Sequence, residues 1–260
     1  MRCSEIITRL EILSPPSFAE KWDNVGLLVG RCDQEISSIY IAVDATDKVI
    51  EEAVLNGADM IITHHPLIFD GLKSITEEDF IGRRVRKLIS ENICYYAMHT
   101  NFDVLGMADA AAEEMELSNS QVLHVTYEDD ISKEGLGRYG KLPRAMTLGE
   151  CAEFVKRKFS LSSVAVYGDL RTVVDIAAIC PGSGKDFVED VIKVGADVYV
   201  TGDISHHTGI DSVAQNLMVI DAGHYGIEKI FVPYMKDFLK KQMPGIKVFT
   251  EETKNPFIVI

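Results

Sequence analysis

The sequence predicts an α/β fold made of two related repeats, each a mixed sheet flanked by helices. Short apolar runs with strand character alternate with amphipathic segments at residues 47–56, 77–90, 185–194 and 226–240. This alternation is typical of βα units, in which functional side chains gather at the carboxyl ends of the strands. A chain of 260 residues is long enough to bury one large core or two modest ones.

The second observation is an internal repeat. Residues 41–65 and 176–207 both contain a strand, a turn, a helical segment, the triplet Gly-Ala-Asp and a second strand with a threonine. The match continues in residues 92–103 and 216–228, where a histidine is followed four positions later by a carboxylate. Chance resemblance between βα units is the alternative, but the shared triplet and spacing favour duplication.

The opening helices of the two repeats, at 3–13 and 147–159, are also similar. We therefore expect one α/β repeat at 1–125 and a second at 126–260. The polar, glycine-rich stretch 128–143 is turn-like in composition and is the expected join. No third domain is expected between the repeats.

Composition excludes several classes of protein. The 26 basic and 40 acidic residues give a net charge of −14, which argues against a nucleic-acid binder or a membrane-surface binder. No apolar run is long enough to span a membrane, and no signal peptide is visible. The five scattered cysteines form no CxxC pair, which predicts a cytoplasmic protein without a disulfide framework or a cysteine zinc site.

The histidines carry the strongest functional signal. Six of the seven fall in clusters that follow or lie close to strand-like runs: His64 and His65, His99, and His206, His207 and His224. A lone histidine at a strand end is usually a hydrogen-bonded structural residue. Several such clusters at comparable strand ends favour a metal site instead.

The spacing of these residues suits two ions. Side chains of neighbouring strand residues point to opposite faces, so His64 and His65 could each serve a different ion. His224 and Glu228 are four residues apart in an expected helix and share one face, and Asp103 takes the matching place in the first repeat. Three imidazoles and two carboxylates are too many for one tetrahedral ion. They suit two divalent ions, with Zn, Fe, Mn, Ni and Co all compatible.

Two further segments have weaker signals. The loop at 181–186 contains Gly-Ser-Gly and could bind an anion on its backbone amides, but it fails the Walker pattern, and a tight turn is equally compatible. The single tryptophan, Trp22, lies in a turn before an apolar run, and the expected role of that segment is structural packing. No separate cofactor-binding residues are predicted.

These motifs resemble, in order and over nearly the whole chain, those of the family called GTP cyclohydrolase I type 2 homologs, or NGG-interacting-factor-three-like proteins. The matching segments are WDNVGLLVG (22–30), ITHHPLIF (62–69), HTNFD (99–103), GLGRYGKL (135–142), GSG (182–184), DVYVTGDISHH (197–207), GHYGIE (223–228) and NPF (255–257).

The resemblance implies roles for individual residues. It implies that His64 and His65 each bind one of the two ions. Asp103 would be a further ligand of one ion and His224 of the other, and the carboxylate of Glu228 would bridge both. His99 is implied to line the site rather than to bind metal. Many relatives have Glu where this chain has Asp203, which weakens any role for Asp203.

The resemblance also implies a metal site between two α/β halves, a ring-shaped homohexamer and the compact form of the family. The leading functional hypothesis is a metal-dependent hydrolase of a small molecule. GTP or a related purine nucleotide is the substrate that the family name suggests. His99, His206 or His207 would carry protons. The alternative is a non-enzymatic metal-binding or scaffold ring. Nucleic-acid binding ranks lowest because of the acidic charge.

Overall fold

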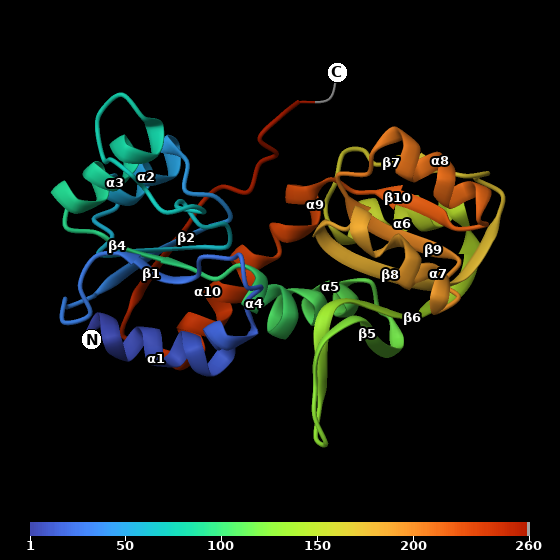
Figure 1. Ribbon diagram of the computed structural model, residues 1–260, viewed down its shortest axis with the longest axis horizontal. Coiled ribbons are helices and arrows are strands. Elements are labelled where there is room, and N and C mark those ends of the chain that lie inside the picture. The colour runs from blue at the N-terminus through green and yellow to red at the C-terminus, as the bar shows by residue number, and fades with distance from the viewer. Residues whose placement is uncertain (259–260) are drawn as a thin grey trace. The chain divides into compact units, whose positions relative to one another are not determined.

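The computed structural model describes residues 1–258 and shows two mixed sheets, each flanked by helices (Figure 1). The predicted fold class is therefore confirmed. The chain divides into two compact units. The first comprises Met1–Phe102 with Phe231–Thr253, and the second comprises Asp103–Ile230 with the C-terminal segment from Lys254.

The first unit contains a five-stranded sheet in the order β1-β4-β3-β2-β11, in which only β1 is antiparallel to its neighbour. Its elements are α1 (Cys3–Leu13), β1 (Gly26–Val29), β2 (Ser38–Ala42), α2 (Asp47–Leu55), β3 (Met60–Thr63), α3 (Phe80–Ser90), β4 (Cys94–Ala97), α4 (Thr100–Phe102), α10 (Phe231–Gln242) and β11 (Lys247–Thr250).

Successive side chains along each strand point to opposite faces of the sheet, and apolar side chains on both sides give this sheet two apolar faces. Tyr40, Ile61 and Tyr95 pack in one cluster with the buried sides of α2 and α3. Figure 1 shows α2 and α3 on one side of the sheet and α1 and α10 on the other. Strands buried on both faces are continuous apolar runs, as observed for β2, β3 and β4.

The second unit contains a six-stranded sheet in the order β5-β6-β8-β9-β10-β7, in which β8, β9 and β10 are parallel and the other pairs antiparallel. Its elements are a π-helical turn (Asp103–Met107), α5 (Ala108–Glu114), β5 (Ser118–Glu128), β6 (Lys133–Thr147), α6 (Leu148–Lys158), β7 (Ala165–Tyr167), β8 (Val173–Ser183), α7 (Val188–Lys193), β9 (Val198–Gly202), α8 (His206–Ala214), β10 (Met218–Asp221) and α9 (His224–Glu228).

In this unit too, successive side chains point to opposite faces of the sheet, and each face has its own apolar core. Ile179 and Val200 pack with α5, α6 and α9, whereas Ala178 and Tyr199 pack with α7 and the loops on the opposite face. The N-terminus of α6 is fixed by a capping box in which Thr147 and Glu150 satisfy each other's backbone amides. The βα pattern predicted from apolar periodicity is thus present in both units.

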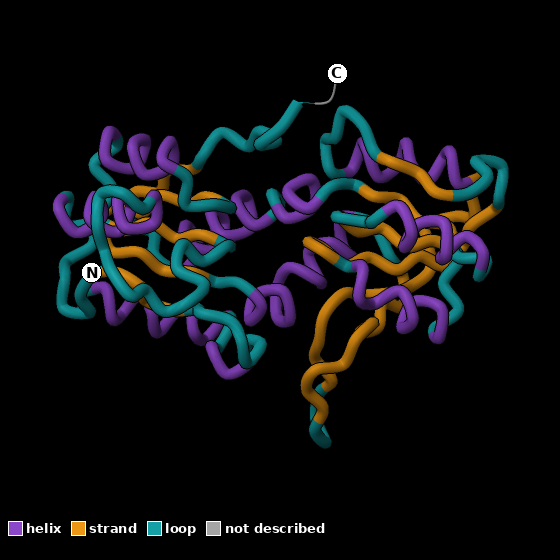
Figure 2. The backbone as a smooth tube through the Cα atoms, turned by 45° about the horizontal axis from the view of Figure 1, so that its top comes forward, coloured by secondary structure: helices purple, strands orange, loops and turns teal. Residues whose placement is uncertain are grey.

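The stretch 128–143, expected to be a turn-like join, is instead mostly strand. It forms the tip of a long β5–β6 hairpin and most of β6, and this hairpin extends beyond the neighbouring strands (Figure 2). The glycines allow the paired strands to approach each other closely. A Cβ on Gly135 would overlap the carbonyl oxygen of His124, and Gly137 has a φ of +65°. Glycine-rich composition therefore marked a bulged hairpin rather than a linker.

The compact units and the sequence repeats do not share boundaries. Residues 103–125 lie in the predicted first repeat but pack in the second unit, and residues 231–253 pack in the first unit. The exchange arises because β5 pairs with β6 and β11 pairs with β2. The repeats at 1–125 and 126–260 stay a prediction about sequence ancestry.

No helix within residues 1–258 is long and apolar enough to cross a membrane.

Candidate metal centre

The first unit brings three histidines together at one edge of its sheet. His64 and His65 directly follow β3, and His99 follows β4; these strands are parallel, so their carboxyl ends meet at the same edge. One ring nitrogen from each of the three lies within 4.8 Å of the others. The distances between ring centroids are 4.9 Å for His64–His65, 5.2 Å for His64–His99 and 5.5 Å for His65–His99.

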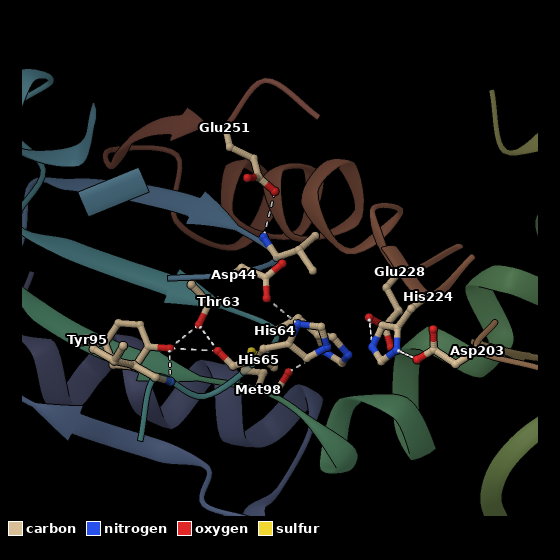
Figure 3. Close-up of polar contacts among 12 residues, drawn as sticks. Asp44, Thr63, His64, His65, Tyr95, Met98, Asp203, His224, Glu228 and Glu251 are labelled. Atoms are coloured by element: carbon tan, nitrogen blue, oxygen red, sulfur yellow. Dashed lines mark hydrogen bonds and ion pairs between the residues drawn. The ribbon is translucent and has the colours of Figure 1, made fainter. Parts of the chain in front are cut away.

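Two of these rings are oriented through Nδ1. His64 Nδ1 lies 2.9 Å from the carbonyl oxygen of Met98, and His65 Nδ1 lies 2.8 Å from Asp44 Oδ1 (Figure 3). A carbonyl and a carboxylate only accept hydrogen bonds, so each Nδ1 carries the proton in the neutral ring. The lone pair is then on Nε2, the arrangement of a histidine prepared to bind a metal ion.

His99 is held by a buried carboxylate. Its Nδ1 lies 2.9 Å from Asp23 Oδ1, and Asp23 also accepts hydrogen bonds from the backbone amide and hydroxyl of Thr100 at 3.0 and 2.5 Å. The Asp23 side chain is fully buried. Burial alone would raise the pKa of Asp23, but the hydrogen bonds from His99 and Thr100 outweigh it and lower the pKa to about 2.

A buried hydroxyl pair fixes the backbone of the tandem histidines. Thr63 Oγ1 and Tyr95 OH lie 2.5 Å apart, and both donate to the carbonyl oxygen of His65, at 2.7 and 2.9 Å (Figure 3). Tyr95 OH also accepts from the amide of Leu67 at 2.8 Å. These bonds fix the turn after β3, so both imidazoles leave the strand in defined directions.

The second unit supplies a histidine and a carboxylate from one helix. His224 begins α9 after β10, and the buried Glu228 follows one turn later, with His224 Nε2 3.0 Å from Glu228 Oε2. The predicted shared face is confirmed. Two ligands at about 2.1 Å from one ion lie about 3 Å apart when they subtend a right angle, so this spacing fits joint coordination.

Asp103 lies in the same unit, close to Glu228. Carboxylate oxygens of the two residues lie within 4.8 Å of each other. Burial raises the pKa of the Cys180 thiol to about 12, and the charges of Asp103 and Glu228 act in the same direction. Asp103 begins the π-helical turn, a form that is frequent at functional sites. The buried Arg138 donates to the carbonyl of Val104 in this turn at 3.4 Å.

Asp203, whose role the sequence comparison weakened, orients His224. Its Oδ2 lies 2.7 Å from His224 Nδ1 (Figure 3), the same arrangement as Asp44 with His65. The backbone of Asp203 is in the left-handed region at a φ of +57°, which a short acidic side chain tolerates better than most. The structure therefore gives Asp203 a positioning contact with the ring of His224.

Two glycines make room for α9. A Cβ on Gly182 would lie 2.5 Å from Glu228 Oε1, and a Cβ on Gly202 would lie 2.4 Å from the backbone nitrogen of His224. The Gly-Ser-Gly loop thus fits closely around a carboxylate. This negative neighbour argues against the alternative that the loop binds an anion.

The structure does not bring every predicted residue to these groups. His206 and His207 are exposed in the first turn of α8, 5.3 Å apart between ring centroids. Among residues 1–258, neither belongs to a group of three or more ligand atoms of the kind described above. Their proton-transfer role stays a prediction.

Sequence reasoning missed the orienting residues Asp23 and Asp44. Asp44 had a usable signal, because it follows β2 at the same sheet edge as His65. Asp23 had none, because it reaches His99 across 76 positions of sequence. The interpretation of Trp22 as a packed structural residue is wrong: 64% of its surface is exposed.

Comparisons with known proteins match nearly the whole chain. The family model Duf34/NIF3 (NGG1p interacting factor 3) matches residues 1–256. A Clostridium perfringens protein named GTP cyclohydrolase 1 type 2 homolog is 34% identical over 261 residues, covering 99% of each chain. A Clostridium acetobutylicum protein of the same name is 36% identical, covering 88% of this chain and 85% of its own.

Among solved structures, a Bacillus cereus protein related to NIF3 superimposes with a TM-score of 0.91 and 25% identity, covering 100% of this chain and 99% of its own. The family match spans nearly all residues and includes both histidine-bearing strand ends. The chain belongs to the Duf34/NIF3 (NGG1p interacting factor 3) family.

Proposed function

We propose that this chain binds two divalent metal ions and hydrolyses a small-molecule substrate, with a purine nucleotide as the leading substrate class. The proposed ligands are His64, His65, Asp103, His224 and Glu228. The observation that carries the proposal is shared by the three histidines in this set: a backbone carbonyl or a carboxylate accepts from Nδ1 of each, which puts the metal-binding lone pair on Nε2.

We further propose that Glu228 is the carboxylate shared by the two ions. The chain passes from the first unit to the second after Phe102 and returns after Ile230. Asp103 follows the first crossing directly, and Glu228 lies two residues before the second. Glu228 is close to both His224 and Asp103, which supports it as the bridging carboxylate.

Divalent ions at this centre would supply a hydroxide near neutral pH and stabilise the negative charge that develops on the substrate. The chain's own residues would orient and transfer protons. Asp44 and Asp203 fix two ligand imidazoles, and Asp23 fixes His99 with Nε2 directed away from the carboxylate. We assign His99 the proton transfer, because imidazole exchanges protons near neutrality.

The relatives' name, GTP cyclohydrolase 1 type 2 homolog, supports a purine nucleotide as the first substrate to test. In that reaction water adds to the carbon between the two nitrogens of the imidazole ring and one C–N bond breaks to leave a formamide. A second water then breaks the remaining C–N bond, which releases formate and leaves the amine. Zn, Fe, Mn, Ni and Co each match the mixed nitrogen and oxygen ligands.

Metal content tests the ligand set directly. Elemental analysis after reconstitution with each ion should give about two ions per chain, and His65→Ala and Glu228→Ala should each lose at least one. His124→Ala is the matched control, because His124 also pairs with a carboxylate, Asp190, at 2.7 Å but is outside the site. Equal metal content in all four proteins would contradict the proposal.

Turnover tests the reaction. Metal-loaded protein should release formate from GTP or hydrolyse another member of a nucleotide, phosphoester and amide panel. His99→Ala should keep its metal and lose most of this activity, with His206→Ala and His207→Ala measured beside it. Two firmly bound ions with no turnover across the panel would favour the metal-binding scaffold instead.

The assembly is also a proposal. The family resemblance of the sequence implies a homohexamer, and sedimentation or light scattering on the metal-loaded protein measures it. A monomer in solution would contradict this expectation.

A further inference from the structure

An aromatic patch beside the tandem histidines contains two rings, Trp22 and Phe69, that have no role in the proposed metal chemistry. We define the patch as Trp22, Phe69 and His99. The ring centroids of Trp22 and Phe69 both lie 5.8 Å from that of His99, at interplanar angles of 74° and 89°. The patch adjoins the candidate ligands, because the His99 ring also contacts His64 and His65.

The two large rings are exposed, at 64% for Trp22 and 49% for Phe69. Large aromatic side chains are normally buried, and exposed ones placed together commonly mark a binding site. Both exposed rings lie beside His99, which in turn contacts the candidate ligands His64 and His65.

The exposure is built into rigid loops. The residue after Trp22 is Asp23, whose buried carboxylate accepts hydrogen bonds from His99 and Thr100. Asn24 Nδ2 donates to the carbonyl of Ile68 at 2.6 Å, and Phe69 follows directly. The loop that carries Trp22 is therefore tied to the loop that carries Phe69 and to the base of His99.

A rigid, exposed pair of aromatic rings around one imidazole is suited to stacking a flat ring. Protein interfaces need roughly 1,000 Å² or more, which two side chains do not provide. A heteroaromatic base matches the size of the patch, and its polar edge can hydrogen-bond to an imidazole.

We propose that Trp22 and Phe69 form a stacking subsite for a planar heteroaromatic ring of the substrate, such as a purine base. The subsite holds the ring next to His99, so that the reacting atom is presented to the metal ligands of the first unit. This inference rests on the proposed function and adds the substrate feature that the site recognises.

Trp22 is the only tryptophan in the chain, so intrinsic tryptophan fluorescence reports on the patch alone. Metal-loaded protein is titrated with GTP and with GMP, and in parallel with ribose 5-phosphate and inorganic triphosphate, which lack a planar ring. A free tryptophan analogue corrects for light absorbed by the nucleotides. Iodide quenching first measures whether Trp22 is accessible in the assembled protein.

We expect saturable quenching by GTP and GMP and none by the ringless compounds. Phe69→Leu should weaken nucleotide binding by about tenfold through lost stacking. Phe80→Leu is the matched control, because Phe80 is 51% exposed in the same unit but is not part of the patch. It should leave binding unchanged.

Three results would overturn the subsite. They are no ring-dependent quenching, equal quenching by inorganic triphosphate, and a Trp22 already shielded from iodide and unaffected by nucleotides. The outcome is separable from the proposed hydrolysis. Ring-dependent binding without turnover contradicts only the hydrolase, and turnover without ring-dependent quenching contradicts only the subsite.

Discussion

The two sheets share a four-stranded framework and differ at the edge where the chemistry lies. The order β1-β4-β3-β2 in the first sheet corresponds to β7-β10-β9-β8 in the second, and in both the first strand is antiparallel to three parallel ones. The helices between the strands also correspond, with α2 matching α7 and α3 matching α8.

The aspartate of the Gly-Ala-Asp triplet makes equivalent hydrogen bonds in both frameworks. Asp59 accepts hydrogen bonds from the backbone amides of Ser37 and Ser38, and Asp197 accepts from those of Asp175 and Ile176. In each case the aspartate that precedes one strand holds its neighbour just before the point where the two strands begin to pair. The triplet therefore maintains the sheet and is not part of the site.

Divergence begins directly after the matched threonines. Thr63 is followed by His64 and His65, whereas Thr201 is followed by Gly202 and Asp203. The first edge thus presents two imidazoles from its strand. The second edge leaves space for α9 and uses an aspartate to orient the histidine of that helix. One framework can therefore carry two different ligand sets.

The strongest test of this difference is Gly202→Ala. The first sheet has a full side chain, His64, at the matching position, but in the second sheet a Cβ would meet the backbone of α9. We expect the free energy of unfolding of the second unit to fall by about 2–3 kcal/mol, together with weaker metal binding. Chemical denaturation and elemental analysis measure these two effects.

Gly149→Ala is the control for that substitution. Its Cβ would make only an ordinary contact, at 3.4 Å, in the first turn of α6, so stability should be unchanged or slightly improved. A well-tolerated Gly202→Ala would show that the two edges are interchangeable.

The next test compares the orienting carboxylates. Asp44→Asn and Asp203→Asn keep the side-chain shape but replace one acceptor oxygen with a donor group. We expect each to weaken metal binding by about 10- to 100-fold, measured by competition with a chelator. Asp190→Asn, beside His124, should have no effect. A loss in only one of the two site variants would mean that one edge binds metal and the other does not.

A smaller effect concerns the shared framework. Asp59 accepts from two amides and two hydroxyls, whereas Asp197 accepts from two amides. We expect Asp59→Ala to lower the free energy of unfolding by about 2 kcal/mol and Asp197→Ala by about 1 kcal/mol. Metal content should be retained in both. Loss of metal in either folded variant would contradict a purely structural role.

The smallest expected effect is a pH dependence of the same aspartate. Burial would raise the pKa of Asp59, but hydrogen bonds from Ser37 and Ser38 outweigh it and leave the pKa below its usual value of 3.8. Asp59 therefore stabilises the fold fully above the unfolded pKa, and this contribution disappears as pH falls through the lower folded pKa.

The stability difference between the wild type and Asp59→Ala should accordingly shrink by about a few tenths of a kcal/mol as pH falls from 5 to 3, since the group is partly exposed and solvent screens its interactions. Denaturant titrations at several pH values measure it. A difference that grows toward acid would contradict the assigned direction.

The sequence alone determined the local features of this protein. The strands before His64, His99 and His224 and the shared helix face of His224 and Glu228 follow from periodicity, which depends only on neighbours in the chain. The repeat was visible for the same reason, because its triplet and threonine occupy equivalent positions in two βα units.

Only the tertiary structure decided how these side chains are held. The contacts of Asp23 with His99, of Asp44 with His65 and of Gly182 with Glu228 join residues separated by 21 to 76 positions, and no local pattern encodes them. The exposure of Trp22 was likewise undetermined, because an aromatic residue in a turn can pack inward or outward. Here the buried bonds of Asp23 and Asn24 fix the loop and leave the indole on the surface.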